Sequence, residues 1–307
     1  GSNGGYSAGL GYDLVTGRGS PIANLVVAGL VGSSTTNSNP GDYTSPSLIF
    51  TTETDHSLWA QNPSDGDWIE LAPAGTILAI SASKDAAGHN EVFALAADHS
   101  LWVHTTAGWS ALAPSGTVSD LSASPNNVVF ALAANAALWE HTAAGWTALT
   151  PPGMVQSVSG GLDGAGAAQA FAVGVDHSLW QWDNNVWKQL SPAGMIRSVG
   201  AGKGIAFVVA SDGSLWQHTA SGWTELSPSG TILSVVAGVD SSGNTVAYVL
   251  ASDHSLWRCS AALTWQELAS SNTVASIGDN QGANLFIVAM NEVPWEFDGS
   301  AWSEVVL

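Results

Sequence analysis

The chain has 307 residues, of which 45% are hydrophobic and 10% are charged, so it holds enough apolar material for a large core. Six Lys or Arg stand against 25 Asp or Glu, and the formal net charge of −19 disfavours nucleic acids and anionic membranes as partners. The single Cys259 excludes an internal disulfide framework, and no apolar run approaches the roughly 20 residues that a membrane helix needs.

The first segment is rich in glycine and reads Gly1-Ser-Asn-Gly-Gly-Tyr-Ser-Ala-Gly-Leu-Gly-Tyr-Asp-Leu-Val-Thr-Gly-Arg-Gly-Ser-Pro21. Up to about Leu30 it resembles the C-terminal end of a sedolisin (serine-carboxyl) peptidase domain. In that family a Gly-x-Gly-x-Asp segment helps to bind calcium through carbonyl and carboxylate oxygens, which are the ligands that calcium prefers. The matching residues are Gly9, Gly11 and Asp13. Calcium is the one metal candidate, and no cofactor is otherwise required.

The same resemblance has consequences for catalysis and location. The family's Gly-Thr-Ser nucleophile motif and its Glu and Asp partners would lie upstream of Gly1 and are absent from this chain. The resemblance therefore implies a non-enzymatic chain, linked in a longer protein to an upstream peptidase domain, and a secreted location. An acidic chain with few bases suits such a location.

Three regions follow from the sequence. Residues 1–30 form the sedolisin-like segment, and its apolar run 24–31 is the candidate for the innermost strand of the first repeat. Residues 31–46 form a linker rich in Ser, Thr, Asn and Gly, and residues 47–307 form a repeat array.

The repeat array is marked by paired tryptophans. Fourteen of the 15 tryptophans form seven pairs, with members seven to nine residues apart and 36 to 43 residues between successive pairs. The first members are Trp59, Trp102, Trp139, Trp180, Trp216, Trp257 and Trp295. The second members are Trp68, Trp109, Trp146, Trp187, Trp223, Trp265 and Trp302. This period matches the roughly 40–45 residues of a four-stranded propeller blade.

The second repeat shows the predicted order of strands and turns. Strands are expected over 78–83, 91–97, 101–105 and 109–112, because these runs are rich in strand-forming residues. Asp98-His-Ser100 and Ala107-Gly108 separate them as tight turns, and Pro114-Ser-Gly116 leads to the next repeat. The sequence therefore predicts an all-β chain, a seven-bladed β-propeller of four-stranded antiparallel blades.

Each repeat carries Asp or Asn at the turn between its second and third strands. Such a side chain caps a backbone N–H two residues further on, which explains its presence in all seven repeats. Four of these turns read Asp-His-Ser, with His56, His99, His177 and His254. Because loop residues on a rigid scaffold often carry function, these histidines are candidates for hydrogen bonding to a ligand. The ring would hold them too far apart to share a metal ion.

The two tryptophans of a pair are expected to differ in role. Rings of this size are expected to fill the space between neighbouring blades, with the indole N–H bonded to a backbone carbonyl, and the first of each pair is expected in the core. The second follows a hairpin, where partial exposure would let the indole stack on a sugar ring. These stacking candidates are Trp68, Trp109, Trp146, Trp187, Trp223 and Trp265. His104, His141 and His218, each two residues after a first tryptophan, are expected to be structural.

The pattern Asp-His-Ser-Leu-Trp…Gly-Trp-x-x-Leu-x-Pro-x-Gly resembles the repeats of tectonin and tachylectin-type propeller lectins over about residues 46–307. The resemblance implies several similar glycan sites around the ring. The leading hypothesis is a non-catalytic carbohydrate-binding propeller with sites between blades, built from the second tryptophans and the Asp-His-Ser loops. The alternative is a protein-interaction or substrate-targeting accessory domain of a secreted sedolisin-like peptidase. A hydrolase in the central channel is disfavoured, because the common catalytic motifs are absent.

Overall fold

The computed structural model describes residues 2–3, 6–7, 48–53, 55–62, 68–240, 242–260, 262–281 and 284–305. The chain divides into two compact units, Gly1–Ser38 and Asn39–Leu307. In the first unit, β1 (Ser2–Asn3) pairs antiparallel with β2 (Tyr6–Ser7). The predicted calcium ligands Gly9, Gly11 and Asp13 and the predicted strand 24–31 lie outside the described residues, so both stay predictions.

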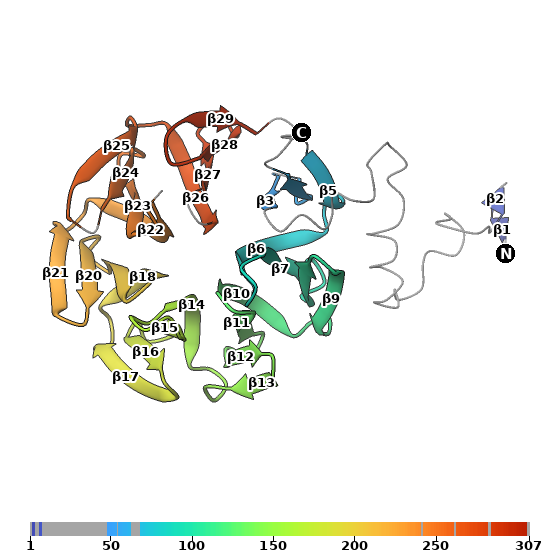
Figure 1. Cartoon of the computed structure of the whole chain (residues 1–307), viewed down its shortest axis with the longest axis horizontal. Helices are drawn as coiled ribbons and strands as arrows, with labels where there is room; N and C mark the ends of the chain where they lie inside the picture. The colour runs from blue at the N-terminus through green and yellow to red at the C-terminus, as the bar shows by residue number, and fades with distance from the viewer. Residues whose placement is uncertain are drawn as a thin grey trace. The chain divides into compact units, whose positions relative to one another are not determined.

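The second unit contains seven antiparallel sheets arranged as blades around a central axis (Figure 1). Blade 1 consists of β3 (Ile49–Thr52), β4 (Leu58–Gln61) and β5 (Trp68–Ala72). Blade 2 consists of β6 (Ile77–Lys84), β7 (Asn90–Ala96), β8 (Leu101–Thr105) and β9 (Gly108–Ala113). Blade 3 consists of β10 (Val118–Ser124), β11 (Val128–Ala133), β12 (Leu138–Thr142) and β13 (Gly145–Ala148). Blade 4 consists of β14 (Val155–Leu162), β15 (Ala168–Gly174), β16 (Leu179–Asp183) and β17 (Val186–Ser191).

The remaining blades repeat the same order. Blade 5 consists of β18 (Ile196–Gly202), β19 (Ile205–Ala210), β20 (Leu215–Thr219) and β21 (Gly222–Ser227). Blade 6 consists of β22 (Ile232–Val239), β23 (Thr245–Ala251), β24 (Leu256–Cys259) and β25 (Trp265–Ala269). Blade 7 consists of β26 (Val274–Gln281), β27 (Asn284–Ala289), β28 (Pro294–Phe297) and β29 (Trp302–Glu304). The seven-bladed, all-β prediction is confirmed, and the predicted strands of the second repeat match β6 to β9 within two residues.

The innermost strands of blades 2 to 7 form a ring around the axis. Each lies against the next along the chain, and β26 of blade 7 also contacts β6 of blade 2. This last contact closes the centre of the ring, while the described strands of blade 1 lie further from the axis (Figure 1).

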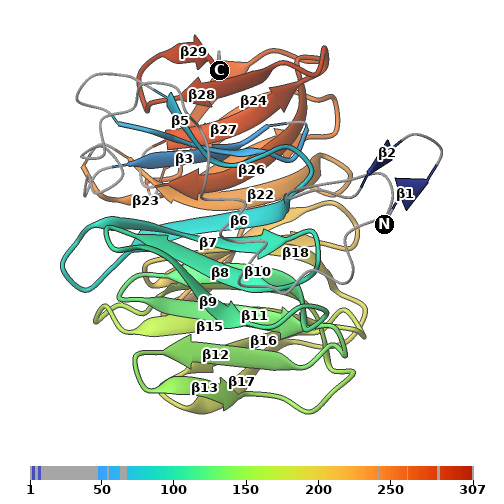
Figure 2. The ribbon, with the colours of Figure 1, turned by 90° about the vertical axis from the view of Figure 1, so that its right-hand side faces the viewer.

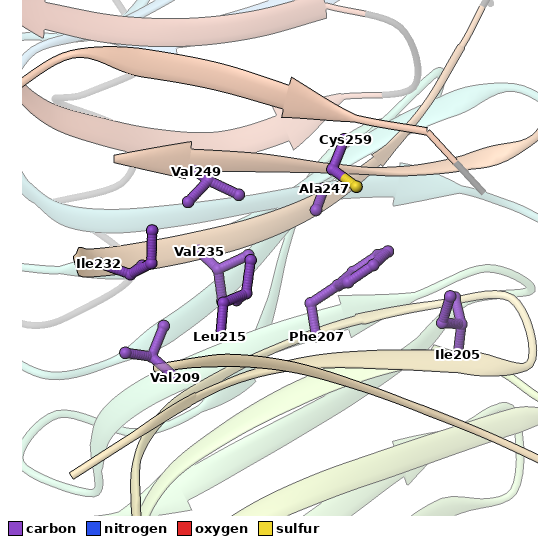
Figure 3. Close-up of a cluster of buried hydrophobic side chains, with 9 residues drawn as sticks. All are labelled: Ile205, Phe207, Val209, Leu215, Ile232, Val235, Ala247, Val249 and Cys259. Atoms are coloured by element: carbon purple, nitrogen blue, oxygen red, sulfur yellow. The ribbon is translucent and has the colours of Figure 1, made fainter. Parts of the chain in front are cut away.

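The core lies between neighbouring blades. The second strand of each of the first six blades carries one aromatic residue that is at most 2% exposed: Phe50, Phe93, Phe130, Phe171, Phe207 and Tyr248. Figure 3 shows one such cluster, in which Phe207 of blade 5 packs with Ile232 and Val235 of blade 6. Because second strands are buried on both sides, they are continuous apolar runs without polar alternation. Burial of this apolar surface is the main source of stability.

The strands run roughly from one face of the ring to the other, as the rim view in Figure 2 shows. The connections between strands therefore gather on two faces. We call one of them the turn face, and it holds two kinds of connection. The turns between second and third strands are 55–57, 97–100, 134–137, 175–178, 211–214, 252–255 and 290–293. The loops from one blade to the next are 73–76, 114–117, 149–154, 192–195, 228–231 and 270–273.

Candidate interaction face

The turns on this face share one hydrogen-bonded design. In blade 5, Asp212 Oδ1 accepts the backbone N–H of Ser214 at 2.9 Å and its hydroxyl at 2.6 Å. The Ser214 hydroxyl in turn accepts the indole N–H of Trp216 at 2.8 Å. Blades 1, 2, 4 and 6 repeat the arrangement. The capping role predicted for the Asp is therefore present, and the bonds from Ser214 hold the pKa of Asp212 below its ordinary value.

The middle residue of every turn has a left-handed backbone. Its φ lies between 61° and 78° in all seven blades, with Gly213 in blade 5 and a non-glycine residue in the other six. In the four Asp-His-Ser turns, the imidazole makes a hydrogen bond to the next blade, and this bond offsets part of the free-energy cost of the left-handed backbone. His56, His99, His177 and His254 donate from Nδ1 to the carbonyl oxygens of Ile77, Val118, Ile196 and Val274, at 2.9 to 3.0 Å. The histidines therefore tie each turn to the innermost strand of the following blade.

The loops between blades complete the face. Gly116 N–H donates to the carbonyl of Asp98, and Val118 N–H donates to that of His99, at 2.8 and 3.1 Å. The same pair of bonds recurs along the array, so that turn and loop form one rigid surface. The Pro-x-Gly element ends on a glycine with positive φ, and Asn272 takes that conformation in the loop that lacks the glycine.

The second tryptophans also join blades. Trp146, Trp187 and Trp302 donate their indole N–H to the carbonyls of Leu112, Leu149 and Leu268 in the preceding blade, at 3.0 to 3.2 Å. Five of the seven first tryptophans bond to a serine hydroxyl, as Trp216 does to Ser214, and Trp139 is 37% exposed. The predicted bond to a backbone carbonyl is therefore present for three second tryptophans, whereas five first tryptophans have a serine hydroxyl as partner.

Two second tryptophans keep a larger exposed surface. Trp223 and Trp265 are each 38% exposed, and within the described ranges their indole N–H groups have no hydrogen-bond partner. Trp68 and Trp109 are half-buried. These are the tryptophans that remain available for stacking.

The structure does not bring the predicted histidines and tryptophans of a blade together. The histidine lies on the turn face before the third strand, whereas the second tryptophan follows the hairpin after that strand. A five-residue strand such as β8 separates the two ends by roughly 16 Å. The Asp-His-Ser loops and the second tryptophans are therefore two separate sets of candidates.

The histidines two residues after a first tryptophan, His104, His141 and His218, lie on the third strands of their blades. His104 is 3% exposed and packs edge-on against Trp109, with ring centroids 5.1 Å apart. Burial lowers its pKa from 6.5 to about 4, so the ring is neutral at physiological pH. His141 contacts Trp146 edge-on as well, His218 contacts Trp223 in a tilted arrangement, and burial lowers the pKa of both histidines. These contacts fit a packing role.

Serine hydroxyls of the innermost strands lie beside the cavity in the central channel. The hydroxyls of Ser81, Ser122 and Ser159 accept backbone N–H groups of Ala123, Gly160 and Ala201 in the following blades, at 2.8 to 2.9 Å. These bonds satisfy N–H groups on the innermost strands. The cavity beside them is lined by Ser, Ala, Gly and Val alone, which leaves no general acid or base in its lining.

Two buried carboxyl groups lie elsewhere. Glu91 is 1% exposed, accepts bonds from Ser83 and Asn127, and has a pKa raised by burial to about 7. Glu296 accepts a bond from Asn284 at 2.6 Å, and burial raises its pKa too. Neither lines the channel cavity, and the described residues hold no group of His, Cys, Asp or Glu that could bind a metal ion. They also contain no helix that could cross a membrane.

Comparison with known proteins supports the fold. No protein-family model and no curated protein matches the sequence. Prp20p from Saccharomyces cerevisiae is similar in structure, with a TM-score of 0.58 at 11% identity over 79% of this chain and 80% of that chain. Human WBSCR16 is similar with a TM-score of 0.57 and 10% identity, over 76% of this chain and 81% of that chain. YCF48 bound to D1 peptide is similar with a TM-score of 0.55 and 14% identity, over 83% of this chain and 89% of that chain.

The chain is a seven-bladed β-propeller. At these identities the likeness concerns the fold alone. The resemblances to tectonin-type repeats and to the end of a sedolisin domain are not shown by the comparisons, and both stay predictions.

The sequence analysis did not single out the exposed apolar residues of the turn face. Met154, Val175, Met195 and Met290 are each at least half exposed, and all four lie in its turns or loops. When the repeats are aligned with one another, each of these four residues differs from the residues that most repeats have at the same position. The fold is needed to show that these four residues lie on the same face.

Proposed function

We propose that the propeller is a non-catalytic protein-binding scaffold whose partner docks on the turn face. The observation that carries the proposal is the placement of exposed methionine and valine side chains on a rigid, hydrogen-bonded surface. Exposed apolar side chains that cluster on one face are characteristic of interaction sites, and methionine adapts its shape to a partner. The channel cavity lacks an acid or base, which favours binding over catalysis.

The similar propellers support this use of the scaffold. The Prp20p structure is described together with its binding to Gsp1p and histones, and YCF48 was solved with a D1 peptide bound. Both are protein or peptide ligands. For the present chain this is support by analogy of fold, because one propeller scaffold hosts many functions.

Carbohydrate binding is the second candidate, and one observation favours it. Trp223 and Trp265 lie in neighbouring blades at the same repeat position, and both indoles are partly exposed. Against it, three of the seven second tryptophans are bonded into the preceding blade. The histidines expected to share their pockets lie at the other end of the third strand. Glycan sites repeated around the whole ring are therefore disfavoured.

The experiment compares both ligand classes on the same protein. Labelled chain is applied to a glycan array and to a protein array, and a Trp223→Ala/Trp265→Ala double variant is run beside it. The proposal predicts a reproducible set of bound proteins that the double variant retains, and a blank glycan array. A coherent set of bound glycans that the double variant loses would contradict the proposal and favour the lectin hypothesis.

A further inference from the structure

The residue before each innermost strand departs from the repeat in two neighbouring blades. It is Thr76, Thr117, Thr231 and Thr273 in blades 2, 3, 6 and 7, but Met154 and Met195 in blades 4 and 5. Three of the threonines donate their hydroxyl to the carbonyl of the loop proline, as Thr117 does to Pro114 at 2.6 Å. Methionine cannot make this bond, so blades 4 and 5 lack a turn-stabilising contact.

A second departure lies beside the first. The residue before the Asx turn is Ala97, Ala134, Ser211 and Ser252 in four blades, but it is Val175 in blade 4 and Met290 in blade 7. Val175 N–H donates to the carbonyl of Met154 at 3.1 Å, so the two residues are adjacent. Met195 N–H donates to the carbonyl of His177, two residues after Val175, at 3.2 Å. We call Met154, Val175 and Met195 the anchor patch.

About half of the surface of each residue in the anchor patch is not used in packing the fold. Its side chains are 54%, 53% and 50% exposed, so most of their apolar surface faces water. In other blades, threonine at the loop position bonds to the loop proline, and alanine or serine at the turn position exposes less apolar surface. Three such departures, linked by backbone hydrogen bonds on one face, indicate a surface shaped for a partner.

The charge around the anchor patch defines the chemistry of that partner. Six of the seven turns carry a carboxylate on the turn face: Asp55, Asp98, Asp176, Asp212, Asp253 and Glu292. Bonds from Ser178 hold the pKa of Asp176 below its ordinary value, and bonds from Ser214 do the same for Asp212, so both stay charged in mildly acidic solution. Among the described turns, loops and innermost-strand ends of this face, Arg197 is the one Lys or Arg side chain, and its guanidinium donates to the carbonyl of Leu233.

This charge also decides between candidate occupants. A second copy of the chain carries the same net charge of −19, which opposes self-association. A partner with Lys or Arg around an apolar anchor gains attraction from the carboxylates and burial from the methionines. We propose, on the basis of the protein-binding function above, that the anchor patch binds large apolar side chains of a basic segment of another protein.

The test selects ligands by chemistry. A random peptide library displayed on phage is selected on the full wild-type chain, with counter-selection on Met154→Thr/Val175→Ala/Met195→Thr. These substitutions insert the residues that other blades carry, so the variant is expected to fold and to regain the threonine–proline bonds. Met290→Ser, which changes a methionine of the same face outside the anchor patch to a residue used at that position, is the matched control.

The expected result is a set of peptides rich in Lys or Arg together with Leu, Met, Phe or Trp. Their affinity should fall about tenfold or more in the triple variant, as loss of interface anchors does, stay unchanged in Met290→Ser, and weaken with added salt. In a methyl spectrum of the three methionines, Met154 and Met195 should shift on peptide addition and Met290 should not. Failure to obtain peptides, acidic peptides, or peptides bound equally by the triple variant would overturn the proposal.

These outcomes separate the anchor patch from the broader function. If the triple variant still binds the proteins found on the protein array, the propeller is a protein-binding scaffold and the anchor patch is not its site. If the protein array is blank as well, the proposed function itself is wrong.

Discussion

The imidazole Nδ1 of His177 lies 3.0 Å from the carbonyl oxygen of Ile196, the first residue of the innermost strand in the next blade. Because a carbonyl oxygen only accepts, Nδ1 must carry the hydrogen and Nε2 is left to face outward. His177 itself has a φ of 63°, a conformation that costs free energy in a non-glycine residue. The bond between blades offsets part of that cost, and it recurs in four of the seven turns.

Two substitutions of His177 separate the contribution of the hydrogen bond to stability from the cost of the left-handed backbone. His177→Ala removes the bond and keeps a Cβ in the left-handed region, so the free energy of unfolding should fall by about 1–2 kcal/mol. His177→Gly also removes the bond but relieves the strain, as Gly213 does in blade 5, and should lose less. Urea unfolding of both variants measures the difference. Equal stabilities of the two variants would show that the left-handed turn is not strained.

The tryptophan bonds between blades can be tested with a matched pair. Trp146→Phe loses the indole N–H bond to Leu112, and the free energy of unfolding should fall by about 1 kcal/mol more than in Trp223→Phe. Trp223 occupies the same repeat position but makes no such bond. Equal losses in the two variants would mean that the bond between blades adds no stability.

Close packing of blades 5 and 6 predicts a strong effect of one methyl group. A Cβ added to Gly200 would lie 2.8 Å from the backbone nitrogen of Ala237, so Gly200→Ala should lose about 1–3 kcal/mol of unfolding free energy. Gly164, in the loop between β14 and β15, has an ordinary φ and open space where the methyl group of an alanine would lie. Gly164→Ala should therefore stay within about 0.5 kcal/mol of wild type. A stable Gly200→Ala variant would contradict this packing between the innermost strands.

The buried side chains of Glu91 and His104 predict opposite effects of pH on the free energy of unfolding. Burial raises the pKa of Glu91 from 4.5 to about 7, so its contribution to stability is complete below pH 4.5 and is lost as pH rises through 7. Burial lowers the pKa of His104 from 6.5 to about 4, so its contribution is complete above pH 6.5 and is lost as pH falls through 4.

Two variants separate these contributions. Glu91→Gln should gain stability relative to wild type as pH rises from 4.5 to 7, and His104→Phe should gain as pH falls from 6.5 to 4. Phenylalanine already occupies the equivalent position in blade 7 as Phe297, which makes it a conservative choice. Unfolding free energies across this range measure both effects. Parallel pH profiles for the wild type and either variant would show that the altered residue does not titrate differently on folding.

The sequence predicted the blades well because their signals are local. Paired tryptophans, Asp-His-Ser turns and Pro-x-Gly loops each fix a turn or strand within a few residues, and repetition strengthens them. The roles of the tryptophans were not predictable in this way. Trp146 bonds to Leu112, 34 residues upstream in another blade, and no local spacing shows which carbonyl is within reach.

The candidate site was missed for a related reason. Met154, Val175 and Met195 do not stand out in the linear sequence, and their exposure depends on the loops and turns being packed into one face. The predicted calcium ligands and the innermost strand of blade 1 fall outside the described residues, so the structure does not bear on them.

One pair of photo-cross-linkers tests the turn face most directly. Ser211 and Ser221 are both exposed in blade 5, the first on the turn face and the second in the hairpin on the opposite face. Each is replaced in turn by a photoreactive phenylalanine analogue, and the chain is irradiated with the proteins it binds on the array. Docking on the turn face predicts covalent adducts from position 211 and none from position 221. Adducts from position 221 alone would contradict the account.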